Sequence, residues 1–139
     1  PDIRLIFTVS PYRYAKYGYH GSQLSKSVLL LAVESVCESF PDVCHYFPSY
    51  EILLDELRDY RFYAEDMHHP SAQTIDYIWS RLAQCAFSTQ TMQYLKEYEP
   101  IRKGLLHRPL QANAEQEKAR RADLESRAAA IRQKYGISL

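Results

Sequence analysis

Two short apolar segments separated by one long apolar helix constrain the fold of this chain most strongly. The first segment, Ile3 to Val9, is rich in β-branched and aromatic residues and ends at Ser10-Pro11. Such a short, almost continuous apolar run predicts a strand buried on both faces. Leu24 to Phe40 is apolar around most of its circumference and predicts a helix, and residues 43–47 predict a second strand. The order strand, helix, strand with short connections predicts a right-handed crossover and a parallel pair of strands.

A second helix is predicted from Ser71 to Phe87. Its apolar residues recur at the spacing of one helical face: Ile75, Ile78, Trp79, Leu82 and Ala86. Pro70 suits the first helical position, where its missing N–H costs nothing. The segment Asp66-Met67-His68-His69 comes directly before this proline. We therefore expect Asp66 and His69 on a loop held by a packed helix, a common place for catalytic groups.

The spacing of Asp66 and His69 favours acid–base chemistry. A histidine acts as a general base near neutral pH, and a nearby carboxylate fixes its tautomer and stabilises the imidazolium. A capping aspartate beside a surface histidine is the alternative interpretation, because chance matches to so short a motif are common. A third one, a metal site formed by Asp66, His68 and His69, is disfavoured because adjacent histidines point apart in most backbones.

Residues 12–22 are predicted to form a loop with four tyrosines and basic residues between them. Tyrosine offers a flat apolar face and a hydroxyl, so the loop suits a binding surface. The alternative is a loop that folds back over its own domain and buries those rings. Tyr12, Arg13 and His20 follow the C-terminal end of a predicted parallel strand, where ligands bind to open α/β sheets. We therefore expect these three residues to line a substrate pocket.

The rest of the chain is predicted to be largely helical. Residues 50–63 are ambiguous between a helix and an irregular loop. From Ser88 the composition changes, and a short helix is expected to be interrupted by Pro100, Gly104 and Pro109. Leu110 to Tyr135 has high helix propensity. Its narrow apolar stripe suits a helix lying on a partner or a short coiled coil, with a solvated appendage as the alternative: Leu124, Ala128, Ile131 and Tyr135. We predict two domains, residues 1–87 and 88–139.

Charge and composition exclude several classes of protein. The formal net charge is zero, so no nucleic-acid partner is expected. The longest apolar run, Val28 to Val33, is far too short to span a bilayer and signal-peptide features are missing, so we expect a cytoplasmic protein without a membrane partner. The three cysteines have no zinc spacing and are expected to be buried free thiols. Because the chain begins at Pro1, close to the first strand, we expect it to be cut from a longer protein.

Several groups of residues resemble the motifs of one family. They are Phe7-Thr8-Val9-Ser10-Pro11-x-Arg13, His20-Gly21-x-Gln23-Leu24-Ser25-Lys26, Tyr46-Phe47-Pro48-x-Tyr50-Glu51-Ile52, residues 55–63, Asp66-Met67-x-His69-Pro70-Ser71 and Tyr77-Ile78-Trp79. In this order, over residues 3–87, they resemble the C-terminal half of the GSCFA proteins. That family is in turn similar to the SGNH (GDSL-like) hydrolases.

The resemblance implies a fold and a partial active site. The fold would be α/β, a partial flavodoxin-like three-layer fold with parallel strands, followed by a C-terminal helical extension. Asp66 would orient the base of a Ser-His-Asp triad and His69 would be the base, while His68 falls out of frame. Neither a Gly-Asp-Ser-like turn nor Gly-Ser-Cys-Phe-Ala occurs in this chain, and the oxyanion-hole motif Gly-x-Asn-Asp is missing, since the only asparagine is Asn113. The chain therefore holds the base half of a site without the attacking half.

These observations lead to two competing functional predictions. The first is a hydrolase of the acyl-ester type that acts on a small ester and needs no cofactor or metal. A sheet cut between strands exposes an unpaired edge, so we expect the missing N-terminal half of the domain, or a second copy in a homo-oligomer, to pair with it. The second is a non-catalytic module that binds protein or glycan through the tyrosine-rich loop and the C-terminal helix.

Overall fold

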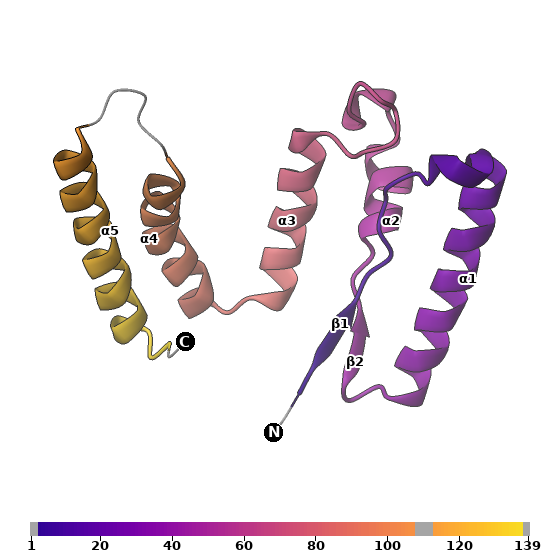
Figure 1. Cartoon of the computed structure of the whole chain (residues 1–139). Coiled ribbons are helices and arrows are strands. Elements are labelled where there is room, and N and C mark those ends of the chain that lie inside the picture. Colours follow the sequence, from indigo (N-terminus) through magenta and orange to yellow (C-terminus); the bar gives the residue numbers. More distant parts are fainter. Residues whose placement is uncertain (1–2, 108–112, 138–139) are drawn as a thin grey trace. The chain divides into compact units, whose positions relative to one another are not determined.

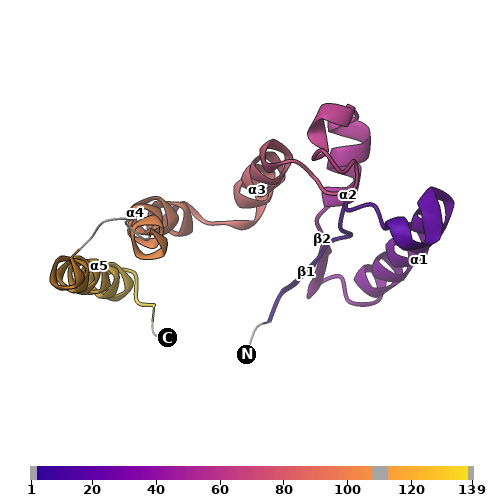
Figure 2. The same ribbon diagram turned by 45° about the horizontal axis from the view of Figure 1, so that its top comes forward.

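The two apolar segments at the start of the chain form a parallel pair of strands, which confirms that prediction. β1 (Leu5–Phe7) lies beside β2 (Cys44–Tyr46), with Leu5 opposite Cys44 and Phe7 opposite Tyr46. The long helix α1 (Gly18–Ser39) connects the two strands and lies alongside them (Figures 1 and 2). This arrangement is seen in a computed structural model, which describes residues 3–107 and 113–137.

The chain divides into two units, Pro1–Cys85 and Ala86–Leu139. The first contains both strands, α1 and the Asp66–His69 segment, and the second contains two long helices. Three of the sequence predictions lie outside the described residues: those on Pro1, on Pro109 and on a helix start at Leu110.

The prediction of a three-layer, flavodoxin-like α/β fold is wrong for this chain. Helices make up most of the described residues, and the sheet there has two strands of three residues each. Two such strands offer too narrow a surface for helices to form a layer on each face. Leu5 and Ile6 accordingly remain 44% and 52% exposed, so β1 is not buried on both faces as its apolar sequence predicts.

Helix α1 starts earlier, and is more exposed, than its sequence predicts. A 3-10 turn (Ala15–Tyr17) and the first turn of α1 replace the end of the expected loop. Gly18 joins them with a φ of 71°, a conformation that glycine adopts without strain. The buried side chains of α1 are polar, Ser22 and Lys26. Much of its apolar surface is exposed, at Leu24, Val28, Leu29, Leu31 and Val36.

The ambiguous segment after β2 is helical at its start and irregular at its end. A single turn, α2 (Ser49–Glu51), continues directly into a π-helical segment, Ile52–Leu57. This helical segment is stabilised by the burial of Ile52 and Leu53. It ends at Arg58, whose φ is 61°. A short 3-10 turn (Tyr60–Phe62) leads on to the Asp66 loop.

Helix α3 (Ala72–Ala86) confirms the helix predicted from the apolar periodicity. It begins two residues after Pro70, so this proline does not take the first helical position but forms a β-bridge with Tyr63. The start of α3 is fixed by Thr74, which is fully buried and donates its hydroxyl to the carbonyl of Phe62 at 2.6 Å. The hydroxyl of Ser71 accepts the backbone N–H of Thr74 at 3.3 Å. The helix is thereby tied to the chain that precedes the Asp66 loop.

The three cysteines are free thiols, but only one of them is buried. Cys44 is buried in β2, Cys37 is half-buried and Cys85 is exposed near the end of α3. The expectation of three buried thiols is therefore wrong. For Cys85 it failed because no other described element packs over the face of α3 that carries this residue.

The second unit is a pair of packed helices, α4 (Thr89–Leu106) and α5 (Ala114–Lys134) (Figure 1). α4 runs through Pro100 and Gly104 without the interruption predicted from the sequence. A proline inside a helix removes one backbone hydrogen bond and destabilises the helix. Packing offsets this cost here, because the next residue, Ile101, is buried against Leu124 and Ala128 of α5. A side chain at Gly104 would come within 3.0 Å of Leu124, so glycine gives α5 room at this point.

The apolar stripe of α5 therefore lies on a partner helix within the same unit. Leu124 and Ala128 are buried, and Ile131 packs against them. The ends of the pair are fixed by polar contacts: Arg120 donates to the carbonyl of Gly104 at 2.7 Å, and Lys134 pairs with Glu97 at 2.8 Å. The solvated-appendage alternative does not describe this helix.

Candidate functional site

The Asp66 loop is a compact chain reversal between the 3-10 turn and α3. Its two ends are held together by the antiparallel bridge of Tyr63 with Pro70 and by a hydrogen bond from the N–H of Ala64 to the carbonyl of His69, at 2.8 Å. At its tip Met67 has a φ of 61°, a conformation uncommon for residues other than glycine. Backbone hydrogen bonds at both ends thus fix the positions of Asp66 and His69.

Asp66 makes three contacts within this loop. One carboxylate oxygen, Oδ1, accepts the backbone N–H groups of His68 at 2.9 Å and of His69 at 3.0 Å. The other, Oδ2, lies 2.5 Å from Nδ1 of the His69 ring. The aspartate therefore organises the turn and holds the imidazole at the same time. It does not cap α3, because the N–H groups that it accepts belong to the loop and Ser71 accepts the N–H of Thr74 at the start of the helix.

This arrangement sets the charge of the carboxylate and the tautomer of the ring. The His69 side chain, followed by the two backbone N–H groups, holds the pKa of the Asp66 carboxyl well below its usual range. An ionised carboxylate only accepts hydrogen bonds, so Nδ1 of His69 donates to it, and in the neutral ring Nε2 carries the lone pair. The His69 side chain is 63% exposed and that of Asp66 is 45% exposed. More than half of the His69 side chain is therefore open to solvent.

The lowered pKa of Asp66 predicts a specific pH dependence of stability. A carboxylate with a depressed pKa stabilises the folded state above its unfolded-state pKa of about 4, and the contribution is lost as the pH falls through the lower folded-state value. We expect Asp66→Asn to be less stable than the wild type at pH 7, with the difference shrinking below about pH 4. Urea unfolding at a series of pH values measures this. A difference that does not change with pH, or an Asp66 carboxyl that titrates near 4 by NMR, would contradict it.

The tyrosine-rich loop, residues 12–22, contacts the Asp66 loop through Tyr12 and Arg13. The backbone N–H of Arg13 donates to the carbonyl of His68 at 3.0 Å, and the guanidinium donates to the carbonyl of Met67 at 3.3 Å. The ring of Tyr12 lies 4.5 Å from that of His69, centre to centre. Two of the three predicted pocket residues, Tyr12 and Arg13, are therefore at the dyad. The third, His20, is exposed in the first turn of α1.

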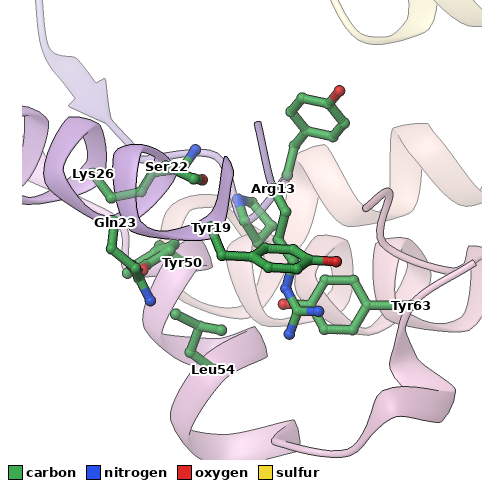
Figure 3. A pocket seen from close by; sticks show the side chains of 10 residues that line it. Arg13, Tyr19, Ser22, Gln23, Lys26, Tyr50, Leu54 and Tyr63 are labelled. Atoms are coloured by element: carbon green, nitrogen blue, oxygen red, sulfur yellow. The ribbon is translucent and has the colours of Figure 1, made fainter. Parts of the chain in front are cut away.

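A cavity of about 340 Å³ lies beside this contact (Figure 3). It is lined by Pro11, Tyr12, Arg13, Tyr19, Ser22, Gln23, Lys26, Tyr50, Leu54 and Tyr63. His20 is not among these residues. Sequence reasoning did not assign Ser22 and Lys26 to the pocket. They lie one helical turn apart on α1 and both are buried, and the spacing of four residues was the signal that could have placed them on one face.

Two buried polar atoms at this site have no hydrogen-bond partner within the described part of the chain. They are the hydroxyl of Tyr63 and Nδ1 of His68. Buried polar atoms are nearly always paired, either with protein groups or with ordered water, so each of these two atoms can still accept or donate a hydrogen bond. No three potential metal ligands come together among residues 3–107 and 113–137, so the structure does not form the metal site considered for His68.

Fold and site define a mainly helical protein with a short parallel βαβ unit and an exposed Asp–His pair on the loop before a helix. The chain belongs to the GSCFA family, whose model matches residues 1–82. Comparisons with curated proteins and with solved structures give no match. Among the described residues, no helix combines the length and apolarity that crossing a bilayer requires.

Proposed function

We propose that this chain supplies the general base and its orienting acid to an ester hydrolase of the SGNH (GDSL-like) type. The observation that carries the proposal is the 2.5 Å contact between Oδ2 of Asp66 and Nδ1 of His69. It leaves Nε2 as the basic nitrogen and places a negative charge where it stabilises the imidazolium. The exposure of the ring leaves room for an incoming hydroxyl group.

The reaction follows from these roles. A serine hydroxyl attacks the acyl carbon of the ester while Nε2 of His69 takes the hydroxyl proton. His69 then gives that proton to the departing alcohol, and the acyl group stays on the serine. A water molecule, deprotonated by the same nitrogen, releases the acid and restores the serine. Asp66 remains ionised throughout and holds the ring in position.

The attacking serine would come from outside these 139 residues, because neither nucleophile motif occurs in them. A further segment of the same domain, from the same molecule or from a second copy of the full-length protein, would bring it to His69. The exposed apolar side chains of β1 and α1, among them Ile6 and Leu31, support such a partner. Large apolar surfaces of this kind mark interaction sites in soluble proteins.

The experiment that tests the proposal is a panel of acetyl and short acyl esters offered to the full-length protein. We expect saturable hydrolysis of at least one ester above the rate in buffer. If no ester in the panel is hydrolysed, the proposal fails.

The cavity beside the dyad supports a second candidate function, a non-catalytic binding module. Arg13 and four tyrosines line the cavity, and the chain has no nucleophile motif of its own. The C-terminal helix does not add an apolar docking stripe to such a module, since Leu124 and Ala128 pack within their own unit. Ligand binding without turnover by the full-length protein would select this candidate over the hydrolase.

A further inference from the structure

Lys26 is a buried cation without a counter-ion in the described part of the chain. The residue is 8% exposed, on the wall of the cavity. Its ammonium donates to the carbonyl of Ser10 at 2.6 Å and forms no ion pair with any described residue. A buried charge is costly unless it is paired, and burial lowers the pKa of this lysine. Two of its three N–H groups remain for another acceptor.

Arg13 brings a second unpaired cation to the same cavity. Its guanidinium carbon lies 3.8 Å from the centre of the Tyr63 ring and 5.9 Å from the centre of the Tyr19 ring (Figure 3). The close cation–π contact with Tyr63 holds the guanidinium, which is charged at any physiological pH, at the cavity. One of its five N–H groups donates to the carbonyl of Met67, so the others can meet a ligand.

The rest of the cavity wall adds neutral groups and no negative charge. None of the lining residues is acidic. The amide oxygen of Gln23 accepts the hydroxyl of Tyr50, which leaves the amide nitrogen as a donor. The tyrosine rings offer flat apolar faces on which a sugar or another ring can stack. Two cations, an amide donor and several aromatic rings therefore surround a space whose volume suits a small molecule.

We propose that this cavity binds an anionic group, a carboxylate or a phosphate, on the molecule that carries the ester. Tyr12 connects the two parts of the site, because it lines the cavity and its ring contacts that of His69. The substrate class, an ester of an anionic small molecule, rests on the proposed hydrolase function. Binding of the anion to this cavity does not depend on the hydrolase function.

Direct binding separates the two claims. Isothermal titration calorimetry on the full-length protein would compare inorganic phosphate, glucuronate and glucose, of which the last two differ in the carboxylate. We expect phosphate or glucuronate to bind, more weakly as salt increases, and glucose not to bind. Which of the two anions binds distinguishes a phosphate from a carboxylate. If neither binds, or if glucose binds as well as glucuronate, the proposal is overturned.

Substitutions test whether Lys26 is responsible. Lys26→Gln should weaken anion binding by roughly 10- to 100-fold, the effect of losing one charged hydrogen bond. The matched control is Lys16→Gln, an exposed lysine of the same region outside the cavity, and it should bind like the wild type. Gln23→Glu keeps the shape of an exposed side chain and adds a negative charge to the cavity, so it should abolish binding even if Lys26→Gln folds poorly. Full affinity in Gln23→Glu would overturn the proposal.

Hydrolysis tests the substrate class separately. The acetyl esters of glucuronate and glucose would be compared in the wild type and in Lys26→Gln. We expect a lower KM for the glucuronate ester, and a KM that rises in Lys26→Gln for that ester alone. Anion binding without hydrolysis of either ester would contradict the proposed hydrolase function but not the proposed anion site. Hydrolysis of both esters with equal KM would contradict the proposed substrate class but not the proposed hydrolase function.

Discussion

Replacing His69 with alanine is expected to lower kcat for a short acyl ester by about 10⁴-fold in the full-length protein. The substitution removes the imidazole that Asp66 holds in position to take the proton of the attacking hydroxyl. KM should change little, because the ring lies beside the cavity rather than in its wall. The residual rate would come from substrate binding and from whatever stabilises the oxyanion.

His45→Ala is the matched control for this loss. His45 is an exposed histidine of β2, in the same unit as the dyad. The control should keep wild-type kcat, which shows that removing a surface histidine is harmless in itself. If His69→Ala hydrolyses esters within a few-fold of the wild type, His69 is not the base and the hydrolase assignment falls.

Asp66→Asn is expected to lower kcat by about 10³-fold, with the fold of the loop retained. Asparagine can still accept the backbone N–H groups of His68 and His69 through its amide oxygen. Its neutral side chain cannot stabilise the imidazolium, and its NH₂ group favours the wrong ring tautomer. The expected loss is smaller than for His69→Ala because the pair is about half exposed and water screens part of the interaction.

Asp76→Asn provides the control for the aspartate. Asp76 is exposed in α3, so its substitution removes the same charge from the same unit without touching the loop. We expect wild-type kcat for it. Circular dichroism and unfolding midpoints of both variants would show whether a loss of activity in Asp66→Asn comes from the chemistry or from a disordered loop.

The local elements of this chain could be predicted from its sequence because they depend on neighbouring residues. Periodicity fixes α3, and the composition of residues 3–9 and 43–47 fixes the strands that pair in parallel. The Asp66–His69 contact was predicted for the same reason, since a turn of a few residues determines it. The interactions that form the helix and the turn lie within a short stretch of sequence. The strand pair joins distant residues, Leu5 with Cys44, and was predicted from the strand-helix-strand order with its short connections.

What the sequence could not predict depends on residues far apart along the chain. Continuous apolarity in β1 predicts burial, but burial requires covering elements, and Leu5 is 44% exposed here. Helix α4 continues through Pro100 because Ile101 packs on α5, a tertiary effect that local propensity does not contain. The cavity likewise combines Arg13 with Tyr63, fifty positions away. The sequence placed Lys26 in a motif but did not show that it faces this cavity.

The central claim is that His69 takes the proton of the attacking hydroxyl and that Asp66 acts only by orienting His69. A double-mutant cycle on kcat/KM for the best ester substrate tests this claim most directly. The four proteins are the wild type, Asp66→Asn, His69→Ala and the double variant. An orienting acid has no function once its base is gone, so the double variant should be no slower than His69→Ala alone. Losses that multiply in the double variant would mean that the two residues act independently, and the account of this site would be wrong.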